Sequence, residues 1–379
     1  MSQKPTFFIC AGEASGDVHA ANLMKAMLKA DPNIQFIGVG GPRMREIGME
    51  CFVNAEKLSV IGFVEVFKNL RFFIKTLNDL VLKMKEYDVK AFIPIDFPDF
   101  NLRLTKKAKR MGVKTIYYIC PQVWAWRKGR VVDIEKCVDL LLTIFPFEED
   151  CFNKKNIKIE YIGHPLLDEV KVEKSKKDVE KDCGKLAIMP GSRHSEIDHH
   201  MPTLVEFMMS FNLKHPGVSF HIPCAHTLRE EDLYKFIPSN AVSSFKEMVH
   251  IYQPGESSSV LKSCDAALIA SGTSTLQGVL CNIPCAIFYK LNAFTYWLGK
   301  KIIKLPFVGL ANLVAERQVC AELLQENMTN DKLTEECETL LWDPQKRDRI
   351  YSDFEEVRGK LGGEGASARA AQIVLDFVK

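Results

Sequence analysis

The sequence lacks the features that mark several large classes of protein. Its 379 residues carry 50 Lys and Arg against 48 Asp and Glu, so no excess of positive charge points to nucleic-acid binding. No C-x-x-C pair occurs among its twelve cysteines, which argues against zinc ribbons and thioredoxin-type chemistry. No apolar run approaches the roughly 20 residues of a membrane-spanning helix, and no signal-peptide pattern is visible. Because the cysteines are scattered through apolar runs, we expect a reducing, cytoplasmic compartment.

Short apolar runs alternate with amphipathic segments in both halves of the chain. The runs that we expect to form strands are Thr6–Cys10, Ile34–Val39, Ala91–Ile95, Thr115–Cys120, Leu140–Phe145, Ile157–Ile162, Lys185–Met189, Val218–Pro223, His250–Gln253, Ala266–Ala270 and Cys285–Tyr289. Helical patterns such as His19–Lys29, Leu102–Met111 and Ile197–Leu213 lie between several of them. This alternation predicts an α/β protein with parallel, doubly wound sheets.

A charged stretch, Asp168–Gly184, interrupts the alternation and is typical of an exposed linker between domains. We therefore expect two Rossmann-like domains, residues 1–170 and 184–345, followed by C-terminal helices over 346–379 that can pack back on the first domain. Ligands of open α/β sheets bind at the carboxyl ends of the strands, so both sheets are expected to face an inter-domain cleft. Motifs that follow the expected strands are the candidates for its lining.

The first such motif is the turn Gly12–Asp17, directly after the first expected strand. Ser15 can cap the next helix, whose amino end favours anions, so Ser15 and Asp17 are candidate substrate contacts. An ordinary strand-to-helix turn would have the same pattern. The G-x-G-x-x-G spacing of dinucleotide sites and the Gly-Lys-Ser/Thr of a Walker loop are both absent.

Two aspartates follow a later strand, in IDFPDFN at 95–101. A carboxylate set among aromatic residues at the carboxyl end of a strand suits a general base with a raised pKa. We predict Asp96 as that base and Asp99 or Asn101 as the cap of the following helix, and both Asp99 and Asn101 are also candidate substrate contacts. The alternative is that both aspartates only stabilise the loop.

Tryptophans and cations gather in PQVWAWRKGR at 121–130. Trp124 can stack on a sugar ring and Arg127 can hold a phosphate, unless the tryptophans form a packed pair with a solvated basic rim. In PGSR at 190–193, Arg193 can neutralise a diphosphate without a metal. The His and acidic residues at 194–200 lack the H-E-x-x-H order, so we expect a solvated helix start and no metal site there.

A glycine and small hydroxyl residues follow the strand that ends at Ala270. At the amino end of a helix they predict an anion cradle of backbone N–H groups and hydroxyls, unless they serve only as caps. The cradle residues are Ser271, Gly272, Thr273 and Ser274. Gln277 lies in the first turns of the same helix, within reach of a ribose hydroxyl.

A stripe of apolar residues at helical spacing runs from 63 to 77, with basic residues between them. Its members are Phe63, Phe67, Leu70, Phe73, Ile74 and Leu77. Such a helix can dock on a membrane, with the basic side chains reaching the head groups. It can equally be an ordinary core helix.

Taken together, these motifs resemble the lipid-A-disaccharide synthase family, inverting glycosyltransferases with the two-domain GT-B architecture. The matching motifs are AGEASGD (11–17), GVGGPRM (38–44), GFVEV (62–66), IDFPDFN (95–101), PQVWAWR (121–127), FPFE (145–148), YIGHP (161–165), PGSR (190–193), ASGTSTL (270–276), ANLVAER (311–317) and ELLQE (322–326). They run in order across nearly the whole chain, and PQVWAWR together with IDFPDFN is highly specific.

The resemblance implies a reaction, its substrates and its setting. A 2,3-diacylglucosamine unit passes from its UDP derivative to 2,3-diacylglucosamine 1-phosphate (lipid X), giving the β-1,6-linked disaccharide 1-phosphate and UDP. The family needs no cofactor and no metal, and it acts peripherally at the cytoplasmic face of the inner membrane. Because both substrates carry acyl chains, the resemblance favours the membrane role of the 63–77 stripe. A homo-oligomer is compatible with these expectations.

By resemblance, Asp96 is the base for the acceptor hydroxyl, and Glu13 is its orienter or an alternative base. Arg193 and the 271–274 cradle would stabilise the departing diphosphate.

Three residues of the late motif, Asn312, Gln325 and Glu326, are expected by resemblance to line the donor pocket. The family tends to carry Glu where this chain has Gln277, which offers one acceptor oxygen instead of two. Glu326 could compensate for that difference.

The nearest rival is another GT-B enzyme of UDP-hexosamines, such as a UDP-N-acetylglucosamine 2-epimerase or a lipid-linked N-acetylglucosaminyl transferase. It would share the ribose and phosphate contacts but not PQVWAWR. An NAD-dependent oxidoreductase is disfavoured by the missing glycine fingerprint. A non-catalytic lipid-binding protein would release no UDP from the two diacyl substrates.

Overall fold

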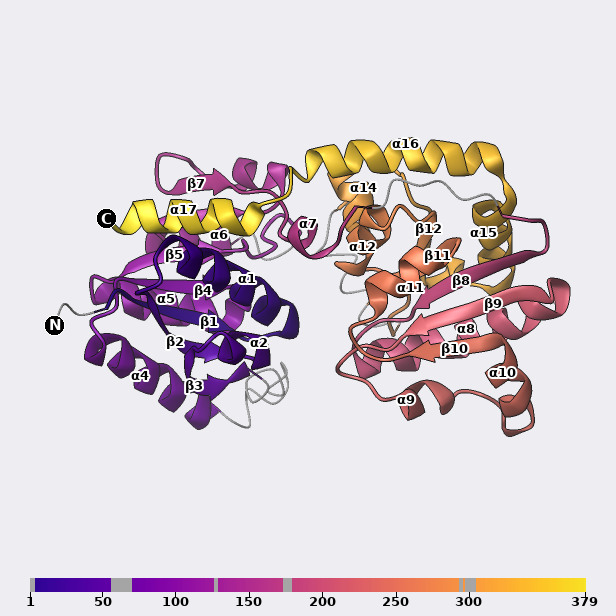
Figure 1. Ribbon diagram of the computed structural model, residues 1–379, viewed down its shortest axis with the longest axis horizontal. Helices are drawn as coiled ribbons and strands as arrows, with labels where there is room; N and C mark the ends of the chain where they lie inside the picture. Colours follow the sequence, from indigo (N-terminus) through magenta and orange to yellow (C-terminus); the bar gives the residue numbers. More distant parts are fainter. Residues whose placement is uncertain (1–3, 56–69, 126–128, 173–178, 293–295, 297–304) are drawn as a thin grey trace. The chain divides into compact units, whose positions relative to one another are not determined.

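The alternating apolar and amphipathic segments fold into two parallel β-sheets, each in its own compact unit (Figure 1). Unit 1 comprises Met1–Asp168 and Leu361–Lys379, and unit 2 comprises Glu169–Lys360. This computed structural model describes residues 4–55, 70–125, 129–172, 179–292, 296 and 305–379.

The sheet of unit 1 has the strand order β3-β2-β1-β4-β5-β6-β7, with parallel neighbours. Its strands are β1 (Thr6–Ala11), β2 (Gln35–Gly40), β3 (Glu50–Asn54), β4 (Ala91–Ile95), β5 (Lys114–Tyr118), β6 (Leu140–Thr143) and β7 (Lys158–Tyr161). The helices described in this unit are α1 (Ala14–Ala30), α2 (Pro42–Glu46), α4 (Leu70–Glu86), α5 (Pro98–Arg110), α6 (Arg130–Cys137), η1 (Pro146–Cys151), α7 (Leu166–Glu169, whose last residue begins unit 2) and α17 (Ala366–Val378).

Helix α5 illustrates how the sequence seats a helix on this sheet. Pro98 suits its first turn, and the buried Phe100, Leu104 and Ala108 recur every four residues. These side chains join a core cluster with α4 and the central strands. Phe100 meets Phe73 of α4 edge-on, with ring centroids 5.1 Å apart. The basic last turn of α5 complements the negative end of the helix dipole.

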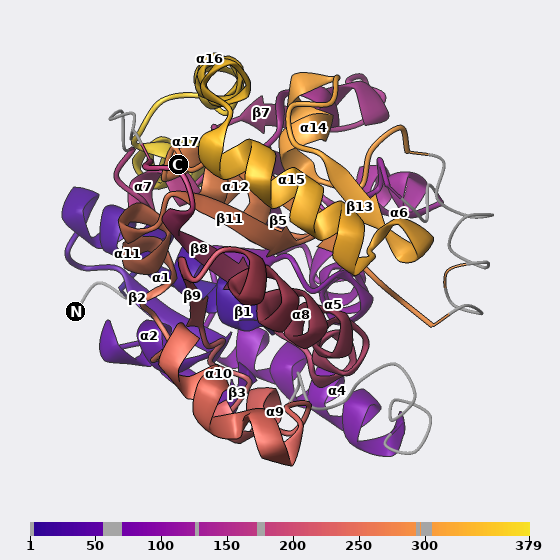
Figure 2. The ribbon, with the colours of Figure 1, turned by 90° about the vertical axis from the view of Figure 1, so that its right-hand side faces the viewer.

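The sheet of unit 2 has the order β10-β9-β8-β11-β12-β13, also with parallel neighbours. Its strands are β8 (Cys183–Met189), β9 (Gly217–Pro223), β10 (Val249–Tyr252), β11 (Ala266–Ala270), β12 (Cys285–Tyr289) and β13 (Glu322–Leu324). The helices described here are α8 (His194–Lys214), α9 (Glu230–Tyr234), η2 (Ser239–Ala241), α10 (Val242–Met248), α11 (Ser257–Ser263), α12 (Ser274–Leu280), α14 (Leu310–Ala315), η3 (Gln325–Asn327), α15 (Asn330–Trp342) and α16 (Pro344–Lys360). Helices α8 and α15 lie side by side in this unit (Figure 2).

The expected strands are confirmed to within two residues at either end, because buried parallel strands carry continuous apolar runs. The sequence patterns missed β3 and β13, which form an edge of their respective sheets. The residues of β3 are half-buried or exposed, and β13 has three half-buried residues. Neither strand therefore has the apolar run by which the others were recognised.

The end of the chain returns to unit 1 through one helix, not two. Helix α16 belongs to unit 2, whereas α17 packs against α1 of unit 1. Asp168, expected as the start of an exposed linker, instead caps α17. Its carboxylate accepts from the backbone N–H groups of Gly365 (2.6 Å), Ala366 (3.2 Å) and Ser367 (2.8 Å).

Two members of the apolar 63–77 stripe are core residues. Phe73 and Leu77 are buried under the sheet of unit 1, so the prediction that they face a membrane is wrong. Ile74 points outward and is 49% exposed. Phe63, Phe67 and the side chain of Leu70 lie outside the described residues.

Replacement of Asp168 by Ala should weaken unit 1, because three N–H groups at the start of α17 would lose their acceptor. We expect a loss of about 1–2 kcal/mol in the free energy of unfolding, measured by urea denaturation. Glu364→Ala, at an exposed neighbour, is the matched control. Equal midpoints for the two variants would contradict the capping role.

Candidate active site

The carboxyl ends of the strands in unit 1 bring several predicted site residues to one edge of the sheet. Glu13 follows β1, and Asp96 follows β4, the neighbour of β1. Trp124 follows β5, the next strand across the sheet. The edge is therefore lined by two acids and an aromatic residue from three loops.

Asp96 and Phe97 have strained backbone conformations. Their φ angles are 43° and 47°, in the left-handed region that costs roughly 1–3 kcal/mol per residue. The Asp96 carbonyl oxygen accepts from Tyr117 Oη and from Asn101 Nδ2, each at 2.8 Å. Gly12 leaves room for the Phe97 ring, since a Cβ there would lie 2.3 Å from it. Contacts from β5, α5 and the β1 loop thus enforce the turn.

The carboxyl of Asp96 binds a proton unusually tightly. Burial and then the negative charge of Glu13 raise its pKa from 3.8 to about 6. The N–H of Phe97 and the charges of His19 and Arg130 act in the opposite direction but do not cancel the rise. A carboxyl with a pKa near 6 is ionised at neutral pH yet basic enough to accept a proton, as a general base must be.

Neither candidate helix cap in IDFPDFN caps α5. Phe97 occupies the cap position and makes no side-chain cap hydrogen bond. Asn101 is fully buried, and its Nδ2 lies within hydrogen-bond distance of carbonyl oxygens from Cys10 and Ile95 (both 3.1 Å), as well as from Asp96. Asn101 therefore ties β1 and β4 together beneath Asp96 and has a structural role. The exposed Asp99 forms an ion pair with Arg130.

In AGEASGD, the two predicted contacts Ser15 and Asp17 differ in outcome. Asp17 is buried, and its carboxylate accepts from the N–H groups of Gly41 (2.9 Å), Arg43 (3.0 Å) and Met44 (3.2 Å). It thereby holds the start of α2, so the structure shows a structural role for Asp17. Ser15 is exposed within the first turn of α1 and is not its cap residue, which is Glu13.

Trp124 is half-buried in an aromatic group that follows β5 and β6. Its ring meets Phe147 edge-on at 5.3 Å, and its Nε1 donates to Glu148 Oε1 at 3.3 Å. The ring therefore packs against phenylalanine side chains, whereas the second tryptophan of the motif, Trp126, lies outside the described residues. Arg127 lies outside the described residues.

Glu148 was missed by sequence reasoning, although FPFE was noted as a motif. It is 1% exposed, and its Oε2 accepts from the N–H groups of Ile144 (2.9 Å) and Phe145 (3.0 Å). Burial raises its pKa to about 7. The available signal was an acid within an apolar and aromatic stretch, directly after an expected strand.

In unit 2, PGSR forms the turn between β8 and α8. The side chain of Arg193 is 68% exposed, and its Nη1 lies 2.9 Å from Glu196 Oε1. Glu196 is buried and also accepts from Ser192 N (2.8 Å) and Tyr289 Oη (3.2 Å). The buried His200 lies 2.7 Å from the Pro190 carbonyl oxygen through Nδ1. The solvated helix start predicted for 194–200 is therefore wrong for Glu196 and His200, which hold the turn that carries Arg193.

The predicted cradle lies at the carboxyl end of β11. Gly272 has a φ of +153°, and no atom lies within 4 Å of a Cβ built there. Ser271 Oγ donates to the Val308 carbonyl oxygen at 3.0 Å. Thr273 is exposed, and Ser274 and Gln277 are half-buried. The following helix, α12, has only seven residues.

The late motif is mostly structural. Asn312 is fully buried, its Nδ2 donates to Cys320 O and Glu322 Oε1, and its Oδ1 accepts from Val319 N and Cys320 N. Its amide has no donor or acceptor left for a ligand, so the predicted donor contact is corrected. The amide of Gln325, with Nε2 toward Leu291 O (3.1 Å) and Oε1 toward Leu291 N (2.9 Å), pairs with the backbone. Glu326 is exposed.

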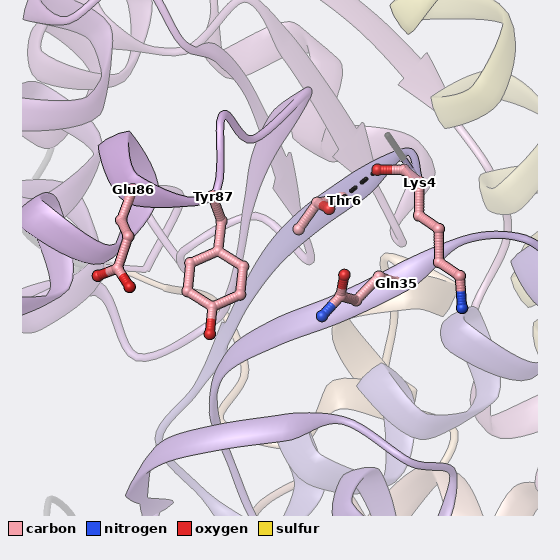
Figure 3. A pocket seen from close by; sticks show the side chains of 5 residues that line it. All are labelled: Lys4, Thr6, Gln35, Glu86 and Tyr87. Carbon is pink, nitrogen blue, oxygen red and sulfur yellow. Dashed lines mark hydrogen bonds between the residues drawn. The ribbon is translucent and has the colours of Figure 1, made fainter. Parts of the chain in front are cut away.

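A separate hollow of about 320 Å³ lies at the amino ends of β1 and β2 (Figure 3). Its lining residues are Lys4, Thr6, Gln35, Glu86 and Tyr87. It lies at the amino ends of the strands, whereas Asp96 lies at their carboxyl ends, so the hollow takes no part in the candidate site. Among the described residues, no group of three or more His, Cys, Asp or Glu side chains is arranged to hold a metal ion.

Comparisons with solved structures show the fold. The chain is similar to the glycotransferase of kitacinnamycin, with a TM-score of 0.66 and 13% identity over 99% of each chain. It is also similar to UDP-GlcNAc 2-epimerase from Methanocaldococcus jannaschii, with a TM-score of 0.63 and 13% identity over 98% of this chain and 99% of that one. The expected α/β architecture with two Rossmann-like units is thus confirmed. At 13% identity, these similarities show the fold alone.

Sequence comparisons are more specific. The family model described as Lipid-A-disaccharide synthetase matches residues 7–377. The lipid-A-disaccharide synthase of Myxococcus xanthus is 36% identical over 100% of this chain and 99% of its own length. That of Coxiella burnetii is 35% identical over the full length of both chains. The chain therefore belongs to the lipid-A-disaccharide synthase family of glycosyltransferases.

Proposed function

We propose that this chain transfers 2,3-diacylglucosamine from UDP-2,3-diacylglucosamine to 2,3-diacylglucosamine 1-phosphate, with inversion at the anomeric carbon. Family membership supports the choice of reaction. One observation supports the chemistry: Asp96, an acid with a raised pKa, lies in strained backbone at the carboxyl edge of a parallel sheet. Such strain is typical of active sites, where the surrounding structure enforces it.

Asp96 is the base in this mechanism. The acceptor's 6-hydroxyl oxygen attacks the anomeric carbon of the donor while its proton passes to the Asp96 carboxylate. The bond between that carbon and the diphosphate breaks, and its electron pair leaves with UDP. Glu13 raises the basicity of Asp96 through its charge, which fits the orienting role, and it is also the alternative base.

Unit 2 binds the donor in this proposal. Arg193 has five N–H donors in a planar fork, which suits paired contacts with phosphate oxygens. The buried Glu196 holds the turn that carries Arg193, so the exposed guanidinium extends from a fixed backbone position. The half-buried Ser271, Gly272 and Ser274, with the exposed Thr273, would contact the diphosphate or the sugar, and Gln277 would contact the ribose. Glu326 is exposed, so it remains a candidate donor contact.

The acyl chains of both substrates suggest a membrane setting. None of the described helices combines the length and apolar character needed to cross a bilayer. On α4, the exposed Ile74 and Leu82 are accompanied by cations at 71, 75, 83 and 85. Apolar side chains flanked by cations fit docking on anionic lipid, so α4 is proposed to contact the cytoplasmic face of the inner membrane.

Asp96→Asn should abolish most transfer, because an amide cannot take the proton. With both diacyl substrates and mass detection of the disaccharide, we expect kcat to fall by about 100-fold or more, with UDP affinity unchanged. The parent's kcat/KM should fall as the pH drops below about 6, where Asp96 becomes protonated. Asp150→Asn, an exposed change of the same kind, is the control. Near-parental turnover of Asp96→Asn would reject the base assignment, and no disaccharide from the parent would reject the function.

Arg193→Ala should weaken UDP binding measured by calorimetry, because charge-assisted hydrogen bonds to the diphosphate are lost. A decrease of about 10- to 100-fold corresponds to such bonds. Arg229 is a matched control, since it precedes α9 as Arg193 precedes α8 and is also exposed. Equal UDP affinity of the two variants would count against the diphosphate contact.

The double variant Ile74→Ser with Leu82→Ser should bind phosphatidylglycerol vesicles more weakly than the parent in sedimentation, with an unchanged melting temperature. Phe73→Ser should instead lower the free energy of unfolding by about 3–5 kcal/mol, as expected for a buried ring. Leu213→Ser, at an 84% exposed residue of unit 2, is the control. Unchanged vesicle binding of the double variant would remove α4 from the membrane contact.

A further inference from the structure

Glu148 is a buried acid whose hydrogen bonds cross between two loops. It lies in η1, the helical turn that follows β6, and Oε2 accepts from two backbone N–H groups of that same loop, Ile144 (2.9 Å) and Phe145 (3.0 Å). Its Oε1 accepts from the indole of Trp124 at 3.3 Å. Trp124 belongs to the loop after β5, so one carboxylate joins the ends of two neighbouring strands.

Aromatic contacts extend the same link to a third loop. The rings of Phe145 and Phe147 stack at 5.3 Å, and the Trp124 ring meets Phe147 edge-on at the same centroid distance. Phe145 lies 5.1 Å from His164, which follows β7. The loops after β5, β6 and β7 therefore share one packed group, with Glu148 as its acceptor of N–H bonds.

A carboxylate suits this position better than an amide or an apolar side chain. Three N–H donors point at its two oxygens, and a glutamine offers only one acceptor oxygen. Burying an acid carries a desolvation cost, which here raises its pKa to about 7. The three N–H hydrogen bonds offset part of this cost and hold their donors in one arrangement.

The loop that carries Trp124 lies next to the loop that carries Asp96, because the two loops follow the neighbouring strands β5 and β4. Tyr117 of β5 donates through Oη to the Asp96 carbonyl oxygen at 2.8 Å, and Asp96 N donates to Tyr118 O at 3.3 Å. The loop that carries Trp124 begins directly after these two tyrosines. The negative charge of Asp96 is also close enough to contribute to the raised pKa of Glu148.

We infer that Glu148 is a positioning residue for the transfer: it fixes the Trp124 loop beside Asp96, where the acceptor sugar is bound. The inference rests on the proposed function, because it takes Asp96 as the base for the acceptor hydroxyl. Glu148 acts through the Trp124 indole and the 144–145 backbone, and it contacts no reacting atom.

The test is a double-mutant cycle of Glu148→Gln and Trp124→Phe in the full chain, with the transfer assay as readout. In Glu148→Gln, the single amide oxygen can serve either the backbone pair or the indole, so its NH₂ group faces the remaining donor. We expect kcat/KM for the acceptor to fall at least tenfold, with KM for the UDP donor and UDP affinity unchanged. Trp124→Phe removes the indole N–H and with it the conflict. The fall in acceptor kcat/KM caused by Glu148→Gln should therefore be at least about threefold smaller in the Trp124→Phe background than in the parent.

Controls separate positioning from loss of fold. Glu149→Gln makes the same change at the next residue, whose carboxylate faces Lys154, and should act like the parent. Melting temperatures of all variants are measured in parallel. If Glu148→Gln does not fold, Trp124→Phe alone still tests the link, because it keeps the backbone bonds of Glu148 and should raise the acceptor KM selectively.

Three results would overturn the inference. In the first, the two substitutions lower acceptor kcat/KM independently of each other. In the second, folded Glu148→Gln keeps an acceptor kcat/KM within twofold of the parent's. In the third, the KM values for donor and acceptor change equally. An inactive parent would instead reject the proposed function itself.

Discussion

The hydrogen bonds of the Asn101 amide are the interactions on which the candidate active site of unit 1 depends. The amide reaches carbonyl oxygens from Cys10, Ile95 and Asp96, and so joins the ends of β1 and β4 at the point where the chain turns into α5. Without a donor there, the strained turn at Asp96 would lose one of the two hydrogen bonds to its carbonyl oxygen. The left-handed backbone at Asp96 and Phe97 can persist because the buried amide, Tyr117 and the space at Gly12 all favour it.

A similar design recurs in both units: buried or half-buried polar side chains hold the backbone of several motifs. Asp17 holds GVGGPRM through three backbone N–H groups, and Glu196 holds PGSR beneath the exposed Arg193. Asn312 and Glu322 do the same for the late motif. A buried acid or amide that is bonded to the backbone in this way sets local geometry. The Asn312 amide, with both N–H groups and both acceptor sites of its oxygen used, has none left for a ligand.

This structural role of polar side chains limits what could be predicted from sequence. The central strands were found because burial on both faces demands apolar runs, and Asp96 was found because it follows one of them. The roles of Asp17, Asn101 and Asn312 could not be predicted, since their partners are backbone groups brought near by tertiary structure. A motif shows that a residue type is required at a position, but not whether it faces a substrate or another part of the chain. Glu148 could have been noticed as an acid within an apolar and aromatic stretch, but its role could not be predicted, because its partners come from two loops.

The return of α17 to unit 1 bears on the order in which the two units can be completed. Unit 2 is continuous in sequence, whereas unit 1 needs its last helix, which packs on α1 some 350 residues earlier. During synthesis, unit 2 can therefore finish before its predecessor does. Until α17 emerges, the surface of α1 that it covers stays uncovered, and contacts of such long sequence separation form slowly. Unit 1 is thus begun first and completed last, because its sheet precedes unit 2 in the sequence and its last helix follows it.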